Sequence, residues 1–305
     1  MSARLCRIEE SADAMGSTFS IVLYGDDQSC MEEAVKAAFG EVERIESVLS
    51  AYRPDSEWSR VNREAAKQSV RVPPEVSSLL ARCLDYSRRS EGAFDISVAP
   101  LLRAWGLARG TGCVPGESEL AEARARVGYR HVHIDPENST VRFDSPGVEI
   151  DPGGIGKGYA VDRAVEVLKE MGFEKALVAG AASSLYGLGA PPGEPRGWRV
   201  DIPDPTNPRR SAARVFLKDL SLSTSGSYEK SFWAGDRVYS HIIDPRTGYP
   251  AQGIVLVSVA APLATDSEAW TKPCFILGRQ WAAKHIPLGF RAFVCEDRPG
   301  GCGWL

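Results

Sequence analysis

Residues 151–162, DPGGIGKGYAVD, combine residue types that bind phosphate in many proteins. Gly153, Gly154 and Gly156 leave room for backbone N–H groups to approach a ligand, and Lys157 adds a positive charge. Apolar residues follow at helical spacing, so the stretch would open onto a helix N-terminus, which favours anions. On these residues alone, a ligand-binding loop and a structural turn both stay open.

Two familiar nucleotide-binding patterns do not fit this stretch. A Walker loop requires GxxxxGK followed by Ser or Thr, whereas Lys157 is followed by Gly158. The dinucleotide pattern GxGxxG fails because Gly158 follows Gly156 one position too early, and no acidic residue stands at the required distance. We therefore assign the stretch to neither class.

Two later stretches place hydroxyl and imidazole groups beside turns. Residues 224–226 read Thr-Ser-Gly, and His241 opens HIIDPRTGYP, in which Asp244 precedes a proline. His241 could act as a general base, because an imidazole titrates near neutral pH, or it could be an ordinary strand histidine. Asp244 is more typical of a turn than of a catalytic carboxylate.

A carboxylate and two large aromatic side chains lie earlier in the chain. Asp95 ends the segment Gly-Ala-Phe-Asp at 92–95, where it could cap the turn that follows. Tyr52 and Trp58 lie in SAYRPDSEWSRVN at 50–62 and could be core residues. Each of these residues has an ordinary structural interpretation when it is taken singly.

Hydrophobic periodicity predicts the elements that position these residues. Helical spacing covers 31–49 and 73–90, a third helix follows the glycines and ends at Gly172, and another begins near Ser267. Because helices and strands mix without strict βαβ alternation, we expect an α+β fold with antiparallel sheet. The predicted strands are 15–24, 132–134, 141–143, 148–150, 176–178, 198–202, 213–217, 238–243, 255–260 and 291–296, with loops at 187–197 and 203–210.

Length, charge and composition exclude several classes of protein. The 305 residues suffice for one large domain or two lobes, and a net charge of -4 without a long run of one sign argues against a nucleic-acid partner. No stretch of about 18 apolar residues occurs, so we expect no transmembrane segment. The first residues lack the apolar core of a signal peptide, so we expect a cytoplasmic location, with export by a route not visible in the chain as the alternative.

Cysteine and histidine patterns predict neither a disulfide framework nor a zinc site. The seven cysteines are odd in number, scattered and without a CxxC motif, so we expect reduced thiols in a cytosol. The four histidines lack the spacing of zinc ligands.

Six ordered blocks, running from about Met15 to Gly278, together resemble the ApbE family. The resemblance implies a T-fold-like, two-lobed α+β architecture with mostly antiparallel sheets and packed helices, in which FAD binds in a cleft between the lobes. It implies an ApbE-like domain over 15–305, preceded by an N-terminal extension at 1–14. The blocks are Met15-Gly16-Ser17, residues 50–62, Gly-Ala-Phe-Asp at 92–95, the glycine-rich stretch at 151–162, Thr-Ser-Gly at 224–226 and His-Ile-Ile-Asp-Pro-x-Thr-Gly at 241–248.

This resemblance implies an FAD-dependent FMN transferase. ApbE-like proteins cleave the pyrophosphate of FAD, attach FMN to a Thr or Ser hydroxyl of a target flavoprotein and release AMP. Some relatives instead hydrolyse FAD to FMN and AMP, and a flavin-binding protein without catalysis is a third interpretation. The chain lacks the family's usual target pattern, Ser/Thr-Gly-Ala-Ser/Thr, so it would donate flavin rather than accept it.

The resemblance also assigns roles to individual residues. Met15 and Tyr52 would line the flavin, while Ala93, Phe94 and Asp95 would contact it from a second segment. The other implied contacts are Gly153, Gly154, Gly156 and Lys157 at the pyrophosphate, Thr224, Ser225 and Gly226 as further hydroxyl and N–H donors, and His241 as the base.

At the expected metal site the chain departs from the family pattern. ApbE-like proteins carry an Asp and, four residues later, a Thr on one side of a helix. These residues bind Mg²⁺ together with a backbone carbonyl that corresponds to Gly156. Here Glu268 stands at the Asp position and Lys272 at the Thr position. Glutamate keeps the carboxylate but is one methylene longer, and an ammonium cannot ligate a cation, which weakens the Mg²⁺ site predicted at Gly156 and Glu268.

Three interpretations of Lys272 stay open. It could pair with Glu268 or the pyrophosphate and replace the charge of the metal, or it could point to solvent while Glu268 holds Mg²⁺. Alternatively, the two residues form an ordinary surface salt bridge in a protein that has lost the chemistry. A one-residue slip would put Thr271 at the ligand position, but Ser267 would then replace the acid. Pro273 is expected to bias Lys272 away from helical geometry.

Overall fold

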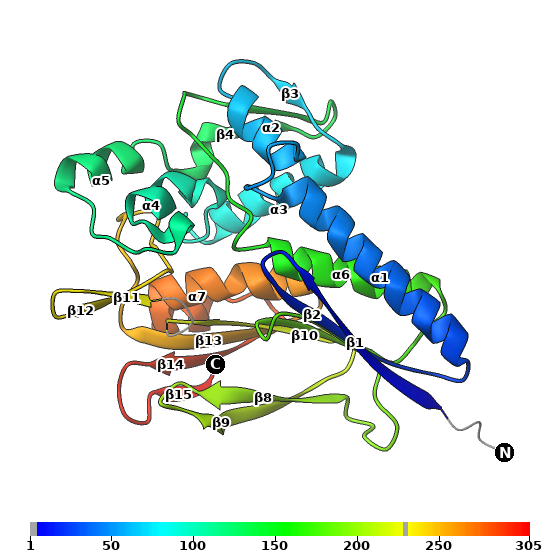
Figure 1. Cartoon of the computed structure of the whole chain (residues 1–305). Coiled ribbons are helices and arrows are strands. Elements are labelled where there is room, and N and C mark those ends of the chain that lie inside the picture. The colour runs from blue at the N-terminus through cyan, green and yellow to red at the C-terminus, as the bar shows by residue number, and fades with distance from the viewer. Residues whose placement is uncertain (1–4, 228–230) are drawn as a thin grey trace.

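An eight-stranded sheet forms the centre of the fold in a computed structural model that describes residues 5–227 and 231–305 (Figure 1). The strand order is β1-β2-β6-β7-β10-β13-β14-β15, and every pairing is antiparallel. This arrangement confirms the predicted α+β class. The strands are β1 (Cys6–Ala14), β2 (Ser17–Gly25), β6 (Ala176–Gly180), β7 (Ser184–Leu188), β10 (Leu220–Gly226), β13 (Ile254–Ala261), β14 (Arg291–Glu296) and β15 (Cys302–Trp304).

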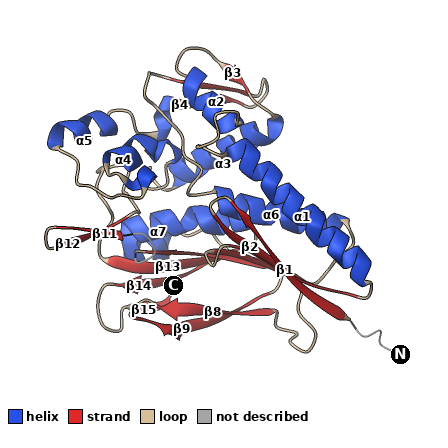
Figure 2. Ribbon diagram, in the orientation of Figure 1, coloured by secondary structure: helices blue, strands red, loops and turns tan. Residues whose placement is uncertain are grey.

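Helices cover one face of this sheet and a β-hairpin packs on the other (Figure 2). Strand β13 shows the consequence: Val257 and Val259 join the core under the helices, whereas Leu256 and Ala260 join the apolar cluster under the hairpin. Because side chains alternate between two buried faces, the strand is apolar at nearly every position. The covering elements are α1 (Gln28–Leu49), α6 (Gly156–Glu170) and α7 (Ala264–His285), and the hairpin strands β8 (Trp198–Asp204) and β9 (Asn207–Leu217).

Most of the smaller elements lie above α7 in Figure 1, and the hairpin of β11 and β12 lies beside it. Trp105 is fully buried there in an apolar cluster with Leu101, Leu120 and Ile243. Of the helices described, none has the length and apolarity needed to cross a membrane. The elements above α7 are α2 (Glu57–Glu64), β3 (Val70–Arg71), α3 (Pro74–Arg89), η1 (Ile96–Val98), α4 (Ala99–Ala104), η2 (Leu107–Arg109), α5 (Glu117–Arg124), η3 (Tyr129–His131), β4 (Val132–Asp135) and β5 (Thr140–Phe143). The hairpin consists of β11 (Ser231–Ala234) and β12 (Arg237–Ser240).

Two segments have a structure that hydrophobic periodicity did not predict. Most of the extension expected at 1–14 forms strand β1, Cys6–Ala14, which pairs with β2 along its whole length at the edge of the sheet. An edge strand buries little apolar surface, so most of its side chains are polar. Hydrophobic periodicity therefore does not reveal this strand. The strand expected at 148–150 is irregular, because the side chain of Asn62 takes up both the N–H and the carbonyl of Ile150.

Other differences concern the ends of strands. The loop expected at 203–210 belongs mostly to the β8–β9 hairpin, in which the pairing register shifts on both sides of Pro203. The strand expected over 238–243 ends at Ser240, because the following residues enter a turn. Strand β14 was expected to be the last, but β15 follows it and pairs with it.

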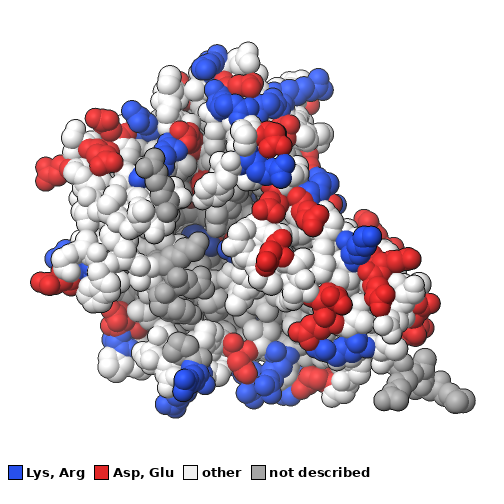
Figure 3. All heavy atoms as spheres, viewed as in Figure 1, with Lys and Arg blue, Asp and Glu red and all other residues white. Residues whose placement is uncertain are grey.

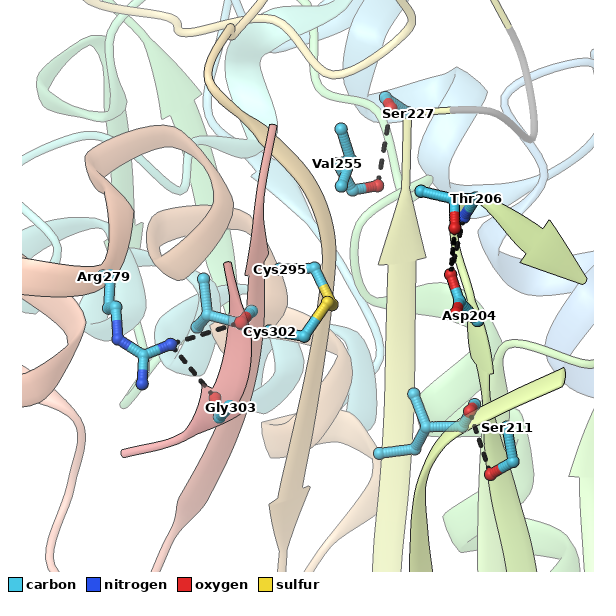
Figure 4. The surroundings of a disulfide bond; sticks show 11 residues. Asp204, Thr206, Ser211, Ser227, Val255, Arg279, Cys295, Cys302 and Gly303 are labelled. Carbon is cyan, nitrogen blue, oxygen red and sulfur yellow. Dashed lines mark hydrogen bonds between the residues drawn. A yellow bond between two sulfur atoms is a disulfide. The ribbon is translucent and has the colours of Figure 1, made fainter. Parts of the chain in front are cut away.

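A disulfide joins the two last strands of the sheet (Figure 4). Cys295 of β14 and Cys302 of β15 are directly opposite in the register, and their sulfur atoms are bonded. From the helical side, Arg279 of α7 donates hydrogen bonds to the carbonyl oxygens of Val294 and Gly303. The expectation of reduced thiols is therefore wrong for this pair.

Helices α6 and α7 cross in close contact at Gly158. A Cβ atom built on Gly158 would lie 2.2 Å from the carbonyl oxygen of Ala264, so only glycine fits. One turn further along α6, Asp162 accepts hydrogen bonds from the backbone N–H groups of Ala264 (2.7 Å) and Thr265 (2.8 Å). These are the first N–H groups of α7, which lack partners within their own helix, so Asp162 caps α7 from a neighbouring helix.

Replacing Gly158 with alanine should destabilise the fold, because the new methyl group meets backbone that cannot move aside. We expect the free energy of unfolding, measured by denaturant titration, to fall by at least about 2 kcal/mol. Gly40→Ala is the matched control, since Gly40 is exposed within α1 and nothing lies within 4 Å of an added Cβ. That variant should gain about 1 kcal/mol from helix propensity. Equal effects of the two substitutions would contradict the proposed close crossing.

Asp162 should make stability depend on pH. Burial raises the pKa of its carboxyl from 3.8 to about 6, although hydrogen bonds from Thr265 and Ala264 oppose the shift. The folded protein therefore binds this proton more tightly than the unfolded chain, and its contribution to stability falls as pH rises from about 4 to about 6.

Comparison with Asp162→Asn isolates this contribution, because the other carboxyl groups cancel in the difference. We expect the free energy of unfolding of wild type minus that of Asp162→Asn to decrease by up to about 3 kcal/mol between pH 4 and pH 7. Denaturant titrations at several pH values measure it. A difference that stays constant with pH would show that burial does not perturb this carboxyl.

Candidate active site

A cleft of about 280 Å³ opens between the upper helices and the helical face of the large sheet. Figure 3 shows the molecule hollowed on this side, with acidic and basic side chains intermingled over the rest of the visible face. The cleft brings together most of the residues that the sequence assigned to flavin, phosphate and catalysis. Those lining it are Tyr52, Ala93, Phe94, Asp95, Gly153, Gly154, Lys157, Thr224, Ser225, His241 and Glu268.

Three predicted contacts, Met15, Gly156 and Gly226, are not among the lining residues. Met15 lies in the turn between β1 and β2 with a positive φ of 53°. Its terminal methyl group packs beneath the start of α6, where it would lie 3.0 Å from a Cβ built on Gly156. Met15 and Gly156 therefore support the glycine loop from behind, and Gly226 ends strand β10.

The glycine loop turns sharply into α6. The N–H groups of Ile155 and Gly156 both donate to the carbonyl oxygen of Pro152, and the N–H of Gly153 donates to Oδ1 of Asp151 at 2.7 Å. Burial raises the pKa of the Asp151 carboxyl. The helix N-terminus that follows carries partial positive charge and points toward the cleft residues of α7.

Glu268 is buried against this helix N-terminus. Its Oε2 accepts a hydrogen bond from the N–H of Gly158 at 2.5 Å, and its Oε1 lies 3.8 Å from Nζ of Lys157. The carboxylate thus caps α6 in the same way that Asp162 caps α7. The interpretation of Glu268 and Lys272 as a solvated helix-surface salt bridge is wrong, because Glu268 is 2% exposed.

Lys272 lies inside the cleft, one turn after Glu268 on the same helix. Its Nζ donates to the main-chain carbonyl of Glu268 (3.3 Å), to Oγ1 of Thr271 (3.2 Å) and to Oγ of Ser225 (3.4 Å). Its Cε would be 3.6 Å from a Cβ built on Gly154, so the side chain lies directly over the glycine loop. The interpretation in which Lys272 points to solvent is therefore wrong.

Pro273 does not unwind the helix. Helix α7 continues through Lys272 and Pro273, and its one non-helical residue is Gly278, with φ 79° and ψ 178°. The expectation that Pro273 biases Lys272 away from helical geometry is wrong, because both neighbouring turns are held in the core by buried side chains such as Trp270 and Phe275.

Buried hydroxyl groups join β10 to α7. Ser223 bonds to Ser267 at 2.7 Å, and Ser225 donates to Thr271 at 2.8 Å. Thr224 points to the opposite face, where its hydroxyl pairs with another strand, and its N–H donates to the β6–β7 turn. The hydroxyl predicted to bind a ligand at Thr224 is thus engaged within the sheet.

His241 lies at the start of a turn that is braced from two sides. Oδ1 and Oδ2 of Asp244 accept hydrogen bonds from the guanidinium of Arg246 at 2.9 and 2.8 Å, and Trp105 donates from Nε1 to the carbonyl of Gly248 at 2.8 Å. Asp244 is therefore a turn residue, as its position before proline predicts. The turn holds His241 at the cleft wall, where it can take a proton from a bound hydroxyl.

Asp95 has mainly a structural role at the cleft wall. Its carboxylate accepts from the N–H and hydroxyl of Ser97 and from the N–H of Tyr129, which confirms that it caps the turn after it. Burial raises the pKa of this carboxyl. Tyr52 is 81% exposed at the mouth, whereas Trp58 is a buried core residue.

Part of the apolar wall of the cleft was not identified in the sequence. Leu102, Leu107 and Ala108 reach the cleft from α4 and η2, and Ile276 reaches it from α7. These residues lie in ordinary apolar runs, which carry no signal that distinguishes a ligand wall from a core. Ser183, from the β6–β7 turn, and Ser184, the first residue of β7, also line the polar side.

The residues at the expected metal position do not fit Mg²⁺. This ion requires near-octahedral oxygen ligands at about 2.0–2.1 Å. Glu268 already accepts an N–H from Gly158 and faces Lys157, while the ammonium of Lys272 bonds to its main-chain carbonyl. Thr271 is equally engaged, since its hydroxyl donates to that carbonyl and accepts from Ser225 and Lys272. Within residues 5–227 and 231–305, no cluster of three or more His, Cys, Asp or Glu side chains could bind a metal.

Comparison with known proteins gives consistent likenesses over nearly the whole chain. The sequence profile of the ApbE family matches residues 15–292. A protein from Treponema pallidum named FAD:protein FMN transferase is 34% identical over 259 residues, which are 80% of this chain and 71% of that protein. A Salmonella typhimurium protein of the same name is 29% identical over 300 residues, which are 95% of this chain and 85% of that protein.

Solved structures agree with the likeness in sequence. The crystal structure of the ApbE protein from Thermotoga maritima has a TM-score of 0.89 and 28% identity, covering 98% of this chain and 96% of that chain. The flavin transferase ApbE from Vibrio cholerae has a TM-score of 0.85 and 25% identity, covering 99% of this chain and 97% of that chain. The likeness in fold extends over nearly the whole chain.

Proposed function

This chain belongs to the ApbE family, and we propose that it is an FAD:protein FMN transferase that attaches FMN to a Thr or Ser hydroxyl of a target flavoprotein and releases AMP. The observation that carries this proposal is the convergence of the glycine loop, two lysines and His241 on one cleft. Phosphoryl transfer needs positioned phosphate, neutralised charge and a base for the nucleophile. The glycine loop can position the phosphate, the two lysines can neutralise its charge, and His241 can act as the base.

The pyrophosphate of FAD would lie at the glycine loop. Gly153 and Gly154 line the cleft without side chains, so backbone can approach the phosphates closely. The N-terminus of α6 favours anions, and Lys157 and Lys272 line the same part of the cleft. The flavin ring would then lie toward the apolar wall, near Phe94.

The transfer step can be written with all atoms balanced. The acceptor oxygen attacks the phosphorus atom on the FMN side of the pyrophosphate, and the bond from that phosphorus to the AMP phosphate breaks. The hydroxyl proton moves to the imidazole of His241, and AMP leaves with one additional negative charge. Positive side chains beside the leaving phosphate therefore act where charge develops.

FAD is the substrate in this proposal, and the partner is a flavoprotein that presents an acceptor Thr or Ser. Mg²⁺, predicted from the family pattern at Gly156 and Glu268, has no part in the proposed step, because the donor set around Glu268 does not fit it. The cytoplasmic location stays a prediction. The bond between Cys295 and Cys302 favours the alternative of an oxidising compartment.

The test of function is incubation with FAD, with and without an acceptor protein that carries the Ser/Thr-Gly-Ala-Ser/Thr pattern. We expect AMP to appear when the acceptor is present, together with covalent FMN on the acceptor in mass spectrometry. Equal release of free FMN and AMP without acceptor would identify an FAD pyrophosphatase instead. Bound FAD that stays intact in both mixtures would identify a flavin-binding protein.

His241→Ala should bind FAD normally and lose transfer, because the acceptor hydroxyl would have no base to take its proton. We expect the rate of AMP release with acceptor to fall about 10²–10⁴-fold, while the FAD dissociation constant from flavin fluorescence stays within twofold. His285→Ala is the control, since His285 is exposed at the end of α7 and does not line the cleft. Unchanged turnover of His241→Ala would refute this role.

A further inference from the structure

We propose that the ammonium groups of Lys157 and Lys272 take the place of a divalent cation at the FAD pyrophosphate, so that this chain binds and cleaves FAD without a metal ion. The proposal rests on the function proposed above, and it deepens the chemistry of the same cleft. It concerns the two positions at which this chain departs from the family's metal-ligand pattern, Glu268 and Lys272.

The two lysines converge on the phosphate site from different helices. Lys157 projects from the first turn of α6, and its Nζ lies 3.8 Å from Oε1 of Glu268. Lys272 projects from α7, and its Cε lies over Gly154. Both side chains line the cleft together with Gly154, so they reach the same part of the ligand.

The positive charges nearest the glycine loop come from the two lysines. Lys157 and Lys272 are the lysine or arginine residues among the described residues that line the cleft, and Glu268 lies close to both. The other two lining carboxyl groups, Asp95 and Asp151, accept backbone N–H groups, and burial raises the pKa of each. Two ammonium groups carry the formal charge of one divalent ion.

Glu268 holds this arrangement together. One of its oxygens binds the N–H of Gly158, and the other faces Lys157. A carboxylate used in this way has little capacity left for a metal ion. A metal ion at this position would also approach the ammonium of Lys272, which bonds to the main-chain carbonyl of the same residue at 3.3 Å. Like charges at such distances repel strongly in a partly buried site.

Lys272 also lies within reach of a phosphate oxygen at the glycine loop, because its Cε lies over Gly154. Its hydrogen bonds to Ser225, Thr271 and the carbonyl of Glu268 measure 3.2–3.4 Å, which is longer than the 2.7–2.9 Å of a strong charge-assisted bond. A phosphate oxygen offers a full negative charge and a shorter bond. As the bond to the AMP phosphate breaks, the ammonium would donate to the oxygen that gains charge.

Metal dependence of the wild-type protein is the first test. FAD binding is followed by flavin fluorescence and AMP release by chromatography, each in EDTA and in excess Mg²⁺. Binding of Mn²⁺ in the presence of FAD is measured by electron paramagnetic resonance. We expect FAD affinity and AMP release to agree within twofold in EDTA and Mg²⁺, with no stoichiometric Mn²⁺ bound. A loss of FAD affinity or AMP release of tenfold or more in EDTA, or one Mn²⁺ per FAD, would overturn the proposal.

Variants of Lys272 then test the charge itself. Lys272→Met keeps most of the methylene packing, so we expect it to weaken FAD binding tenfold or more in both EDTA and Mg²⁺. The double variant Lys272→Thr, Glu268→Asp restores the family pattern. We expect this variant to bind FAD in a Mg²⁺-dependent manner and to bind Mn²⁺ itself. Lys284→Thr, on the exposed end of α7, should leave binding within twofold of wild type.

Folding of each variant is checked by circular dichroism and a thermal melt. Unchanged FAD affinity in Lys272→Met would contradict the proposal even if the double variant does not fold. Failure of the proposed function gives a different result. If no AMP is released under any condition, the transferase assignment fails, while the FAD affinities and Mn²⁺ binding still decide whether lysine replaces the metal.

Discussion

The site depends on an exchange of carboxylates between two helices that cross at Gly158. Asp162 of α6 accepts the first free N–H groups of α7, and Glu268 of α7 accepts an N–H from the first turn of α6. Each helix N-terminus is thus satisfied by an acid from the other helix, in a contact that only glycine permits. Because both partners are buried, neither helix can slide or rotate without leaving polar groups unpaired. The glycine loop and α7 are therefore fixed relative to each other.

A second polar seam fixes α7 to the sheet beneath it. Ser223 and Ser225 of β10 bond to Ser267 and Thr271 of α7 across an otherwise apolar interface. Apolar side chains could pack there in several registers, whereas paired hydroxyl groups favour one. The register determines that the residue after Thr271 faces the glycine loop. The sheet, the helix and the loop thus determine where the ammonium group of Lys272 lies. The chemistry of the cleft therefore depends on the packing beneath it.

The sequence could predict much of this fold and most of the cleft, for identifiable reasons. The hydrophobic pattern of the sequence predicts helix α1 and strand β13, because the apolar positions of each are the ones that the fold buries. The cleft residues were recognised as an ordered set of blocks, not from their physical properties. Strand β1 was missed because an edge strand buries little. Met15 was assigned to the flavin, but its methyl group packs against the start of α6 instead of lining the cleft. The direction of Lys272 could not be predicted, because it depends on the helix crossing and on the hydroxyl seam.

The two departures from the family pattern are connected physically. Glutamate is one methylene longer than aspartate, and in this chain its carboxylate reaches the N–H of Gly158 on the neighbouring helix. Because this carboxylate caps a helix, it does not hold a metal ion. The phosphate site therefore lacks the positive charge that a bound ion would bring. Lysine one turn later returns positive charge to that site, and its stem packs over Gly154. Neither replacement alone would supply positive charge at the phosphate site without conflict. With Glu268 and a threonine, the site would have no cation. With Lys272 and a ligating aspartate, the ammonium would compete with the metal ion. The pair therefore acts as one unit.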